Sequence, residues 1–74
     1  MAAQFVAYGK IESMVAEYGA CEMPKDWLKQ HAYRYCAKIV GDEDYDTEFC
    51  KTLKDARETA RYAANNLGVK VHSL

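Results

Sequence analysis

Cysteine and histidine are the residue types with which this chain could bind zinc or carry out nucleophilic catalysis. A zinc site needs four ligands converging at about 2.0–2.3 Å, and a nucleophile needs a base within hydrogen-bond reach. The chain has no Cys-x-x-Cys pair, no His-x-x-x-His pair, no nucleophile elbow and no glycine-rich phosphate loop. We therefore predict no metal, no cofactor and no enzymatic activity. The residues concerned are Cys21, Cys36, Cys50, His31 and His72.

An acidic segment over residues 42–48 carries five carboxylates. Asp42, Asp44 and Asp46 alternate, as the oxygen ligands of a calcium loop do. Thr47 replaces the glycine that such a loop requires, and Leu53 replaces its bidentate glutamate. We therefore interpret the segment as a solvated turn that favours the start of a helix, with docking on a basic partner surface as the functional alternative. Its acidic residues are Asp42, Glu43, Asp44, Asp46 and Glu48.

Two groups of basic residues could contact a partner. Lys54, Arg57 and Arg61 recur at three and four residues, which places them on one flank of a helix. A second group mixes aromatic and cationic side chains, as interface hot spots do, and could also stack on a nucleic-acid base. The alternative for both groups is ordinary solvated surface charge. The second group consists of Trp27, His31, Arg34 and Lys38.

Apolar residues at helical spacing predict three helices, over about residues 3–18, 24–40 and 46–67. Pro24 fits the start of the second helix, and a glycine follows each helix where a left-handed residue often ends one. The sequence therefore predicts an all-α three-helix bundle with a short C-terminal tail over residues 69–74. Alanines on the third helix would allow close packing in the bundle or in a homodimer. The buried face of that helix is predicted to be Phe49, Leu53, Ala56, Ala60, Ala63 and Leu67.

Size and composition limit the chain to one domain, residues 1–74. The formal net charge of −1 predicts no general attraction to nucleic acid or anionic lipid. No apolar run approaches the roughly 18 residues of a membrane span, and the first residues lack the pattern of a secretion signal. Three widely spaced cysteines favour a reducing, cytoplasmic setting.

We expect from these observations a small non-enzymatic protein-binding module that docks on a larger partner. Inhibitors and accessory proteins of phages and other mobile elements offer an analogy at the level of the class. The alternative is a nucleic-acid-binding protein that uses the basic flanks. A helix-turn-helix reader is disfavoured, because its recognition helix would begin with the acidic segment and push carboxylates toward phosphates. The flanks of the alternative are Lys54, Arg57, Arg61, Arg34 and Lys38.

Overall fold

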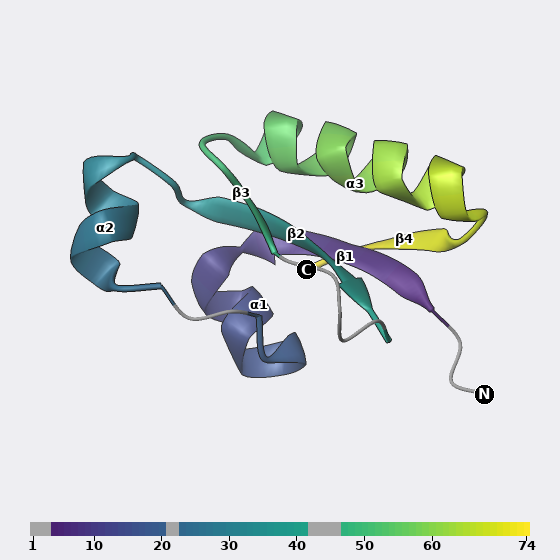
Figure 1. The fold of residues 1–74 in the computed structure, drawn as a ribbon, viewed down its shortest axis with the longest axis horizontal. Helices are drawn as coiled ribbons and strands as arrows, with labels where there is room; N and C mark the ends of the chain where they lie inside the picture. Colours follow the sequence, from purple (N-terminus) through teal and green to yellow (C-terminus); the bar gives the residue numbers. More distant parts are fainter. Residues whose placement is uncertain (1–3, 21–22, 42–46) are drawn as a thin grey trace.

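The computed structural model describes residues 4–20, 23–41 and 47–74. They form a four-stranded mixed sheet with three helices (Figure 1). The strand order is β3-β2-β1-β4, in which β1 pairs antiparallel with β2 and parallel with β4, and β2 pairs antiparallel with β3. The elements in chain order are β1 (Phe5–Lys10), α1 (Ile11–Tyr18), α2 (Lys25–Gln30), β2 (Tyr35–Val40), β3 (Glu48–Cys50), α3 (Leu53–Leu67) and β4 (Lys70–Ser73).

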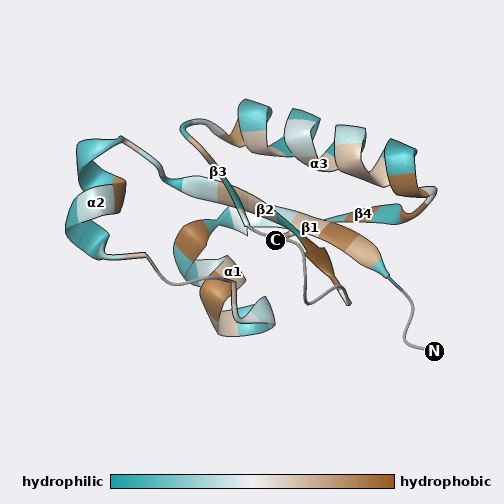
Figure 2. Ribbon diagram, in the orientation of Figure 1, coloured by the Kyte–Doolittle hydropathy of each residue, from teal (hydrophilic) through white to brown (hydrophobic). Residues whose placement is uncertain are grey.

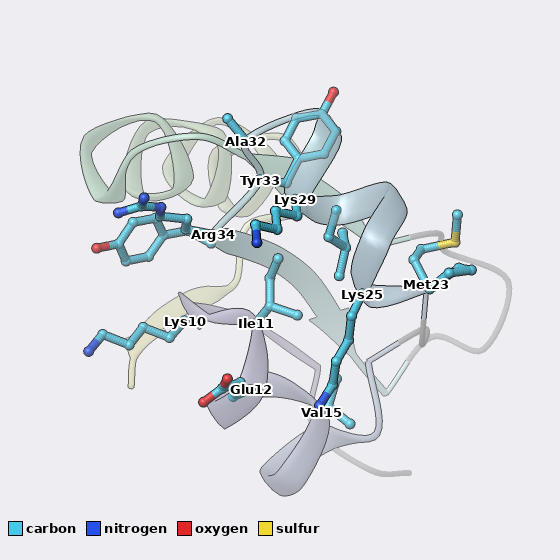
Figure 3. Close-up of a pocket in the computed structure, with 13 residues that line it drawn as sticks. Lys10, Ile11, Glu12, Val15, Met23, Lys25, Lys29, Ala32, Tyr33 and Arg34 are labelled. Atoms are coloured by element: carbon cyan, nitrogen blue, oxygen red, sulfur yellow. The ribbon is translucent and has the colours of Figure 1, made fainter.

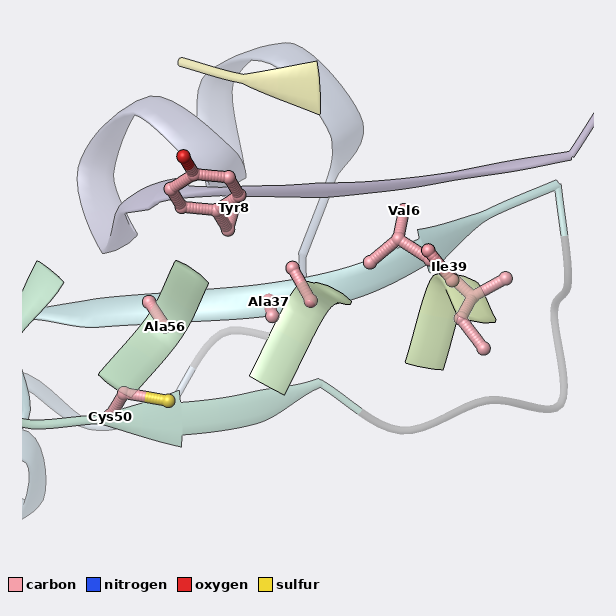
Figure 4. Packing of buried hydrophobic residues seen from close by; sticks show 8 residues of the cluster. Val6, Tyr8, Ala37, Ile39, Cys50 and Ala56 are labelled. Atoms are coloured by element: carbon pink, nitrogen blue, oxygen red, sulfur yellow. The ribbon is translucent and has the colours of Figure 1, made fainter. Parts of the chain in front are cut away.

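Helices cover both faces of the sheet, so the chain has two apolar clusters. On one face α3 packs three buried alanines against strand residues that include Val6, Tyr8 and Ile39 (Figure 4). On the opposite face Met14 of α1 packs against Ala7 and Cys36. Figure 2 shows hydrophobic residues concentrated along the central strands and α1, while α3 is largely hydrophilic away from the sheet. The buried alanines of α3 are Ala56, Ala60 and Ala64.

The prediction of an all-α three-helix bundle is wrong. The predicted helix over residues 3–18 is strand β1 followed by α1, and the predicted helix over residues 24–40 is α2 followed by β2. Because both faces of β1 are covered, residues 6–9 are all buried and show no alternation of apolar and polar types. Ala7 and Tyr8 precede Ile11 by four and three residues, and Met14 follows Ile11 by three, which imitates a helical stripe across the strand–helix junction.

The third predicted helix is confirmed in its C-terminal part and wrong at its start. Residues 48–50 form β3, and α3 begins at Leu53 after the cap Thr52, whose Oγ1 accepts a 3.1 Å hydrogen bond from the backbone N–H of Asp55. Residues 69–74, predicted to be a tail, contain β4, which pairs with β1. Gly19 and Gly68 end α1 and α3 in the left-handed region as predicted, but Gly41 follows a strand.

The buried face of α3 differs in phase from the predicted face. Leu53 and Leu67 are 47% and 46% exposed, Ala63 is only half-buried, and Ala64 is buried. The face of α3 that packs on the sheet is therefore made of small alanines and not of the larger residues at the two helix ends. The alanine-rich face is therefore covered within one chain and is not free to form the homodimer contact that we predicted there.

Candidate functional site

Helix α2 projects from one end of the sheet (Figure 1) and contributes no buried residue. Aromatic rings connect it to the body of the protein. The ring centroid of Trp27 lies 5.6 Å from that of Tyr33 and 6.1 Å from that of Phe49, and Tyr33 lies 5.9 Å from Phe49. A helix of six residues is too short to be stable alone, so these contacts help hold it in place.

His31 extends this ring cluster at the end of α2. Its ring stacks on Trp27 at 4.5 Å with an interplanar angle of 25°, and it lies 5.8 Å from Tyr33 at 13°. Its Nδ1 lies 3.1 Å from the carbonyl oxygen of Trp27, which accepts a hydrogen bond when Nδ1 carries the proton. Trp27 and His31, which we grouped from the sequence, are thus brought together.

A tight reversal at Ala32 leads the chain from α2 toward β2. Ala32 has φ of +57°, a left-handed conformation that glycine adopts more readily than alanine. Its N–H donates to the carbonyl of Lys29 at 3.1 Å, and the N–H of Tyr33 donates to that of Leu28 at 2.9 Å. These bonds satisfy the free carbonyls at the helix end.

A groove of about 1110 Å³ lies between α1, α2 and the start of β2 (Figure 3). Ile11 and Val15 of α1 and Leu28 of α2 contribute half-buried aliphatic side chains to its lining. Leu28 belongs to neither apolar cluster of the sheet. The lining therefore offers apolar area that the fold itself leaves partly uncovered.

Cationic side chains surround this apolar lining. Lys10, Lys25, Lys29 and Arg34 line the groove against one carboxylate, Glu12, and all five residues are exposed. Among the described residues that line the groove, four positive charges and one negative charge give a net charge of +3, in a chain whose formal net charge is −1. Charges of one sign that line a cleft reinforce one another's field, so the groove attracts anionic groups.

The backbone of Arg34 is fixed at this rim by two hydrogen bonds. Its carbonyl accepts from the N–H of Ile11 at 3.1 Å, and its N–H donates to the carbonyl of Cys50 at 3.2 Å. Arg34 thereby joins the start of α1 to strand β3. The groove is held on this side by the sheet, whereas on the other side it is formed by the projecting helix α2.

The other predicted contact residues lie elsewhere. Lys38 is half-buried on β2, where its Nζ donates a 3.1 Å hydrogen bond to the carbonyl oxygen of Tyr18 at the end of α1. It therefore stabilises a helix end and does not join the ring pair of Trp27 and His31. Arg34 lines the groove, and neither Trp27 nor His31 is among the described residues of that lining. The stripe of Lys54, Arg57 and Arg61 is exposed along α3.

Of the acidic segment, only Glu48 falls within the described residues, and it is exposed at the start of β3. The other four acidic residues lie outside the described part of the chain. Among residues 4–20, 23–41 and 47–74, no group of three or more histidine, cysteine or carboxylate side chains could hold a metal ion.

Burial keeps the described cysteines in their thiol form. Desolvation raises the pKa of Cys36 to about 11, with a further increase from nearby Cys50, and desolvation also raises the pKa of Cys50. Cys36 packs on the α1 face of the sheet and Cys50 on the α3 face, and both are free. Neither has the lowered pKa of an activated nucleophile.

Sequence reasoning missed the groove and several of its residues. Lys25 and Lys29 are four apart, a spacing that places them on one side of α2, and this signal was available. No local pattern indicates that Lys10, at the end of β1, lines the same groove, since that placement depends on the β1–β2 pairing of Lys10 with Tyr35.

Comparison of the chain with protein-family models, with curated proteins and with solved structures finds no match. Within the part of the chain that the structure describes, no helix combines the length and apolar character needed to cross a bilayer.

Proposed function

We propose that this protein is a non-enzymatic protein-binding module and that the groove between α1 and α2 is its docking surface. One observation carries the proposal: half-buried aliphatic side chains at the groove are surrounded by exposed charged ones. An apolar centre within a polar rim is the usual anatomy of a protein interface. We propose that the partner is a larger protein, on which this chain acts as an inhibitor or accessory subunit.

The energetics favour docking at this groove over docking on other apolar positions. Covering the exposed parts of Ile11, Val15 and Leu28 gains roughly 25 cal/mol for each Å² of apolar surface removed from water. The fixed backbone of Arg34 reduces the ordering cost on one side of the groove. The exposed leucines of α3, Leu53 and Leu67, lie at opposite ends of the helix and do not form a comparable patch.

The reducing cytoplasm is the setting in which we propose that the module acts. Cys36 and Cys50 are free thiols, which such a compartment preserves. The core relies on their packing as small apolar side chains.

A substitution at the groove tests this function. Leu28→Glu places a charge in the apolar lining, and Leu53→Glu makes the same change on α3 at a residue that is also partly exposed. The tagged chain and both variants would be used to capture proteins from the native host, after circular dichroism shows that each variant is folded. We expect the wild-type chain and Leu53→Glu to capture the same partner in a defined stoichiometry. We expect Leu28→Glu not to capture it. Equal capture by Leu28→Glu contradicts the proposal.

A second candidate function is nucleic-acid binding through α3, because Lys54, Arg57 and Arg61 are all exposed along that helix. Binding driven by phosphate contacts weakens steeply as the salt concentration rises. Replacing the three residues by glutamine should reduce the slope of log affinity against log salt concentration by about three. Absence of binding to single- or double-stranded nucleic acid at low salt contradicts this candidate. Lys38 has no part in it, since its ammonium group is bound to the carbonyl of Tyr18.

A further inference from the structure

We infer that the segment bound in the groove is acidic, with carboxylates that contact the rim cations and an apolar side chain that covers Leu28. This inference rests on the proposed function and names the chemistry of the partner. The occupant is a protein segment rather than a nucleic acid or a small anion. Two observations support an anionic ligand, and a third supports a protein segment.

The rim cations come from separate parts of the chain and line one groove. Lys10 ends β1, Lys25 and Lys29 belong to α2, and Arg34 precedes β2. In Figure 3 the side chain of Lys25 extends from α2 toward Val15 of α1, across the groove. Basic side chains that gather from three elements produce a field that the surface of a single helix does not.

These cations have no carboxylate partner of their own within the described residues. None of the four forms an ion pair with another residue of 4–20, 23–41 or 47–74. Glu12 is the one carboxylate among the described residues that line the groove, so the net charge of these residues is +3. Carboxylates of a partner would relieve the mutual repulsion of the cations and would speed association at low salt.

The shape of the groove distinguishes a protein segment from other anions. Its volume of about 1110 Å³ exceeds that of most pockets for small ligands. The aliphatic side chains of its lining would make no favourable contact with an isolated phosphate. Nucleotide bases would need free aromatic faces. Of the described aromatic residues that line the groove, Tyr33 stacks on His31 at a centroid distance of 5.8 Å, and Tyr35 is half-buried against the apolar cluster beneath α3.

A pair of synthetic peptides tests the inference with the full chain. One fluorescein-labelled peptide alternates glutamate with leucine, and the matched peptide has glutamine at every glutamate position. We expect the glutamate peptide to bind at least about tenfold more tightly at low salt, as measured by fluorescence anisotropy. The double variant Lys25→Glu and Lys29→Glu should lose at least about tenfold in affinity for the glutamate peptide. The matched control, Lys54→Glu and Arg57→Glu, should bind it as the wild-type chain does.

Several outcomes would overturn the inference. Equal affinity of the glutamate and glutamine peptides would show that binding at the groove does not require carboxylates. Equal loss in the α2 and α3 double variants shows a general effect of net charge. Tighter binding of a single-stranded oligonucleotide, lost in the α2 variant alone, assigns the groove to nucleic acid.

The inference and the proposed function can fail separately. Leu28→Glu could release the captured partner while the α2 double variant retains it. The proposal of docking at the groove would then stand, and the inference that the partner's bound segment is acidic would be wrong. If both variants retain the partner, both proposals are wrong.

Discussion

Leu74 lies directly over Gly9 of β1: a Cβ added at Gly9 would stand 2.8 Å from the Cβ of Leu74. The N–H of Leu74 also donates to the carbonyl of Tyr8 at 2.9 Å, which continues the pairing of β4 with β1. We expect Gly9→Ala to lower the free energy of unfolding by about 1–3 kcal/mol, because Leu74 must move away. Urea denaturation of the two proteins measures this difference.

Leu74→Gly provides the control for that prediction, because it removes the clashing Cβ and keeps the backbone hydrogen bond. In this background Gly9→Ala should be neutral or stabilising, since alanine has a lower entropic cost than glycine in a strand. An equal destabilisation in both backgrounds would show that the contact with Leu74 is not the cause.

The backbone conformation of Ala32 indicates that a glycine at this position would stabilise the protein. Its φ of +57° costs an alanine roughly 1 kcal/mol, and glycine adopts this conformation freely. We expect Ala32→Gly to raise the free energy of unfolding by up to about 1 kcal/mol. Ala16→Gly, at an exposed position inside α1, should lower it by about 1 kcal/mol. Two changes of the same sign in denaturant unfolding would refute the assigned backbone strain.

Removing the ammonium group of Lys38 should lower the stability of the fold, whether or not a partner binds. Lys38→Met keeps the aliphatic stem and removes the ammonium group that donates to the carbonyl of Tyr18. We expect a loss of about 1 kcal/mol in the free energy of unfolding, because a positive charge near a helix C-terminus is favourable. Lys70→Met, at an exposed position of β4, should change stability by less than about 0.5 kcal/mol. Similar losses in both variants would argue against the bond.

The raised pKa of the Cys36 thiol should make the stability of the protein depend on pH in the alkaline range. Its pKa is raised from 9.0 to about 11 in the folded protein, so the neutral thiol is favoured by folding. This contribution is fully present below pH 9 and is lost as the pH rises from 9 through 11. The difference in unfolding free energy between the wild-type chain and Cys36→Ala should therefore shrink by on the order of 2 kcal/mol across that range. A difference that stays constant with pH would contradict the raised pKa.

The ends of two helices were predictable because their signals are local. Gly19 and Gly68 stop α1 and α3, and both adopt positive φ values that glycine permits. The strands were not predictable from periodicity, because β1 is buried on both faces and its apolar residues merge with those of α1. The same ambiguity joined α2 to β2 in one predicted helix, although the reversal at Ala32 separates them.

The candidate site was predictable only where its residues are close in the sequence. Trp27 and His31 are four apart, and they stack as neighbours on α2. Lys38 shared their apparent helical phase, yet it lies on β2 and points to the end of α1. Lys10 and Arg34 meet at the groove through strand pairing and a backbone bond to Ile11, which no spacing rule encodes.

The parallel pairing of β4 with β1 has a consequence for how the protein matures during synthesis. Phe5 pairs with Lys70 and Tyr8 with Ser73, so one side of β1 stays without its neighbour until residues 70–73 have been translated. Contacts between such distant positions form slowly, because a long loop must close first. During that interval one edge of β1 presents unpaired backbone groups, the kind of edge at which another chain can add a strand.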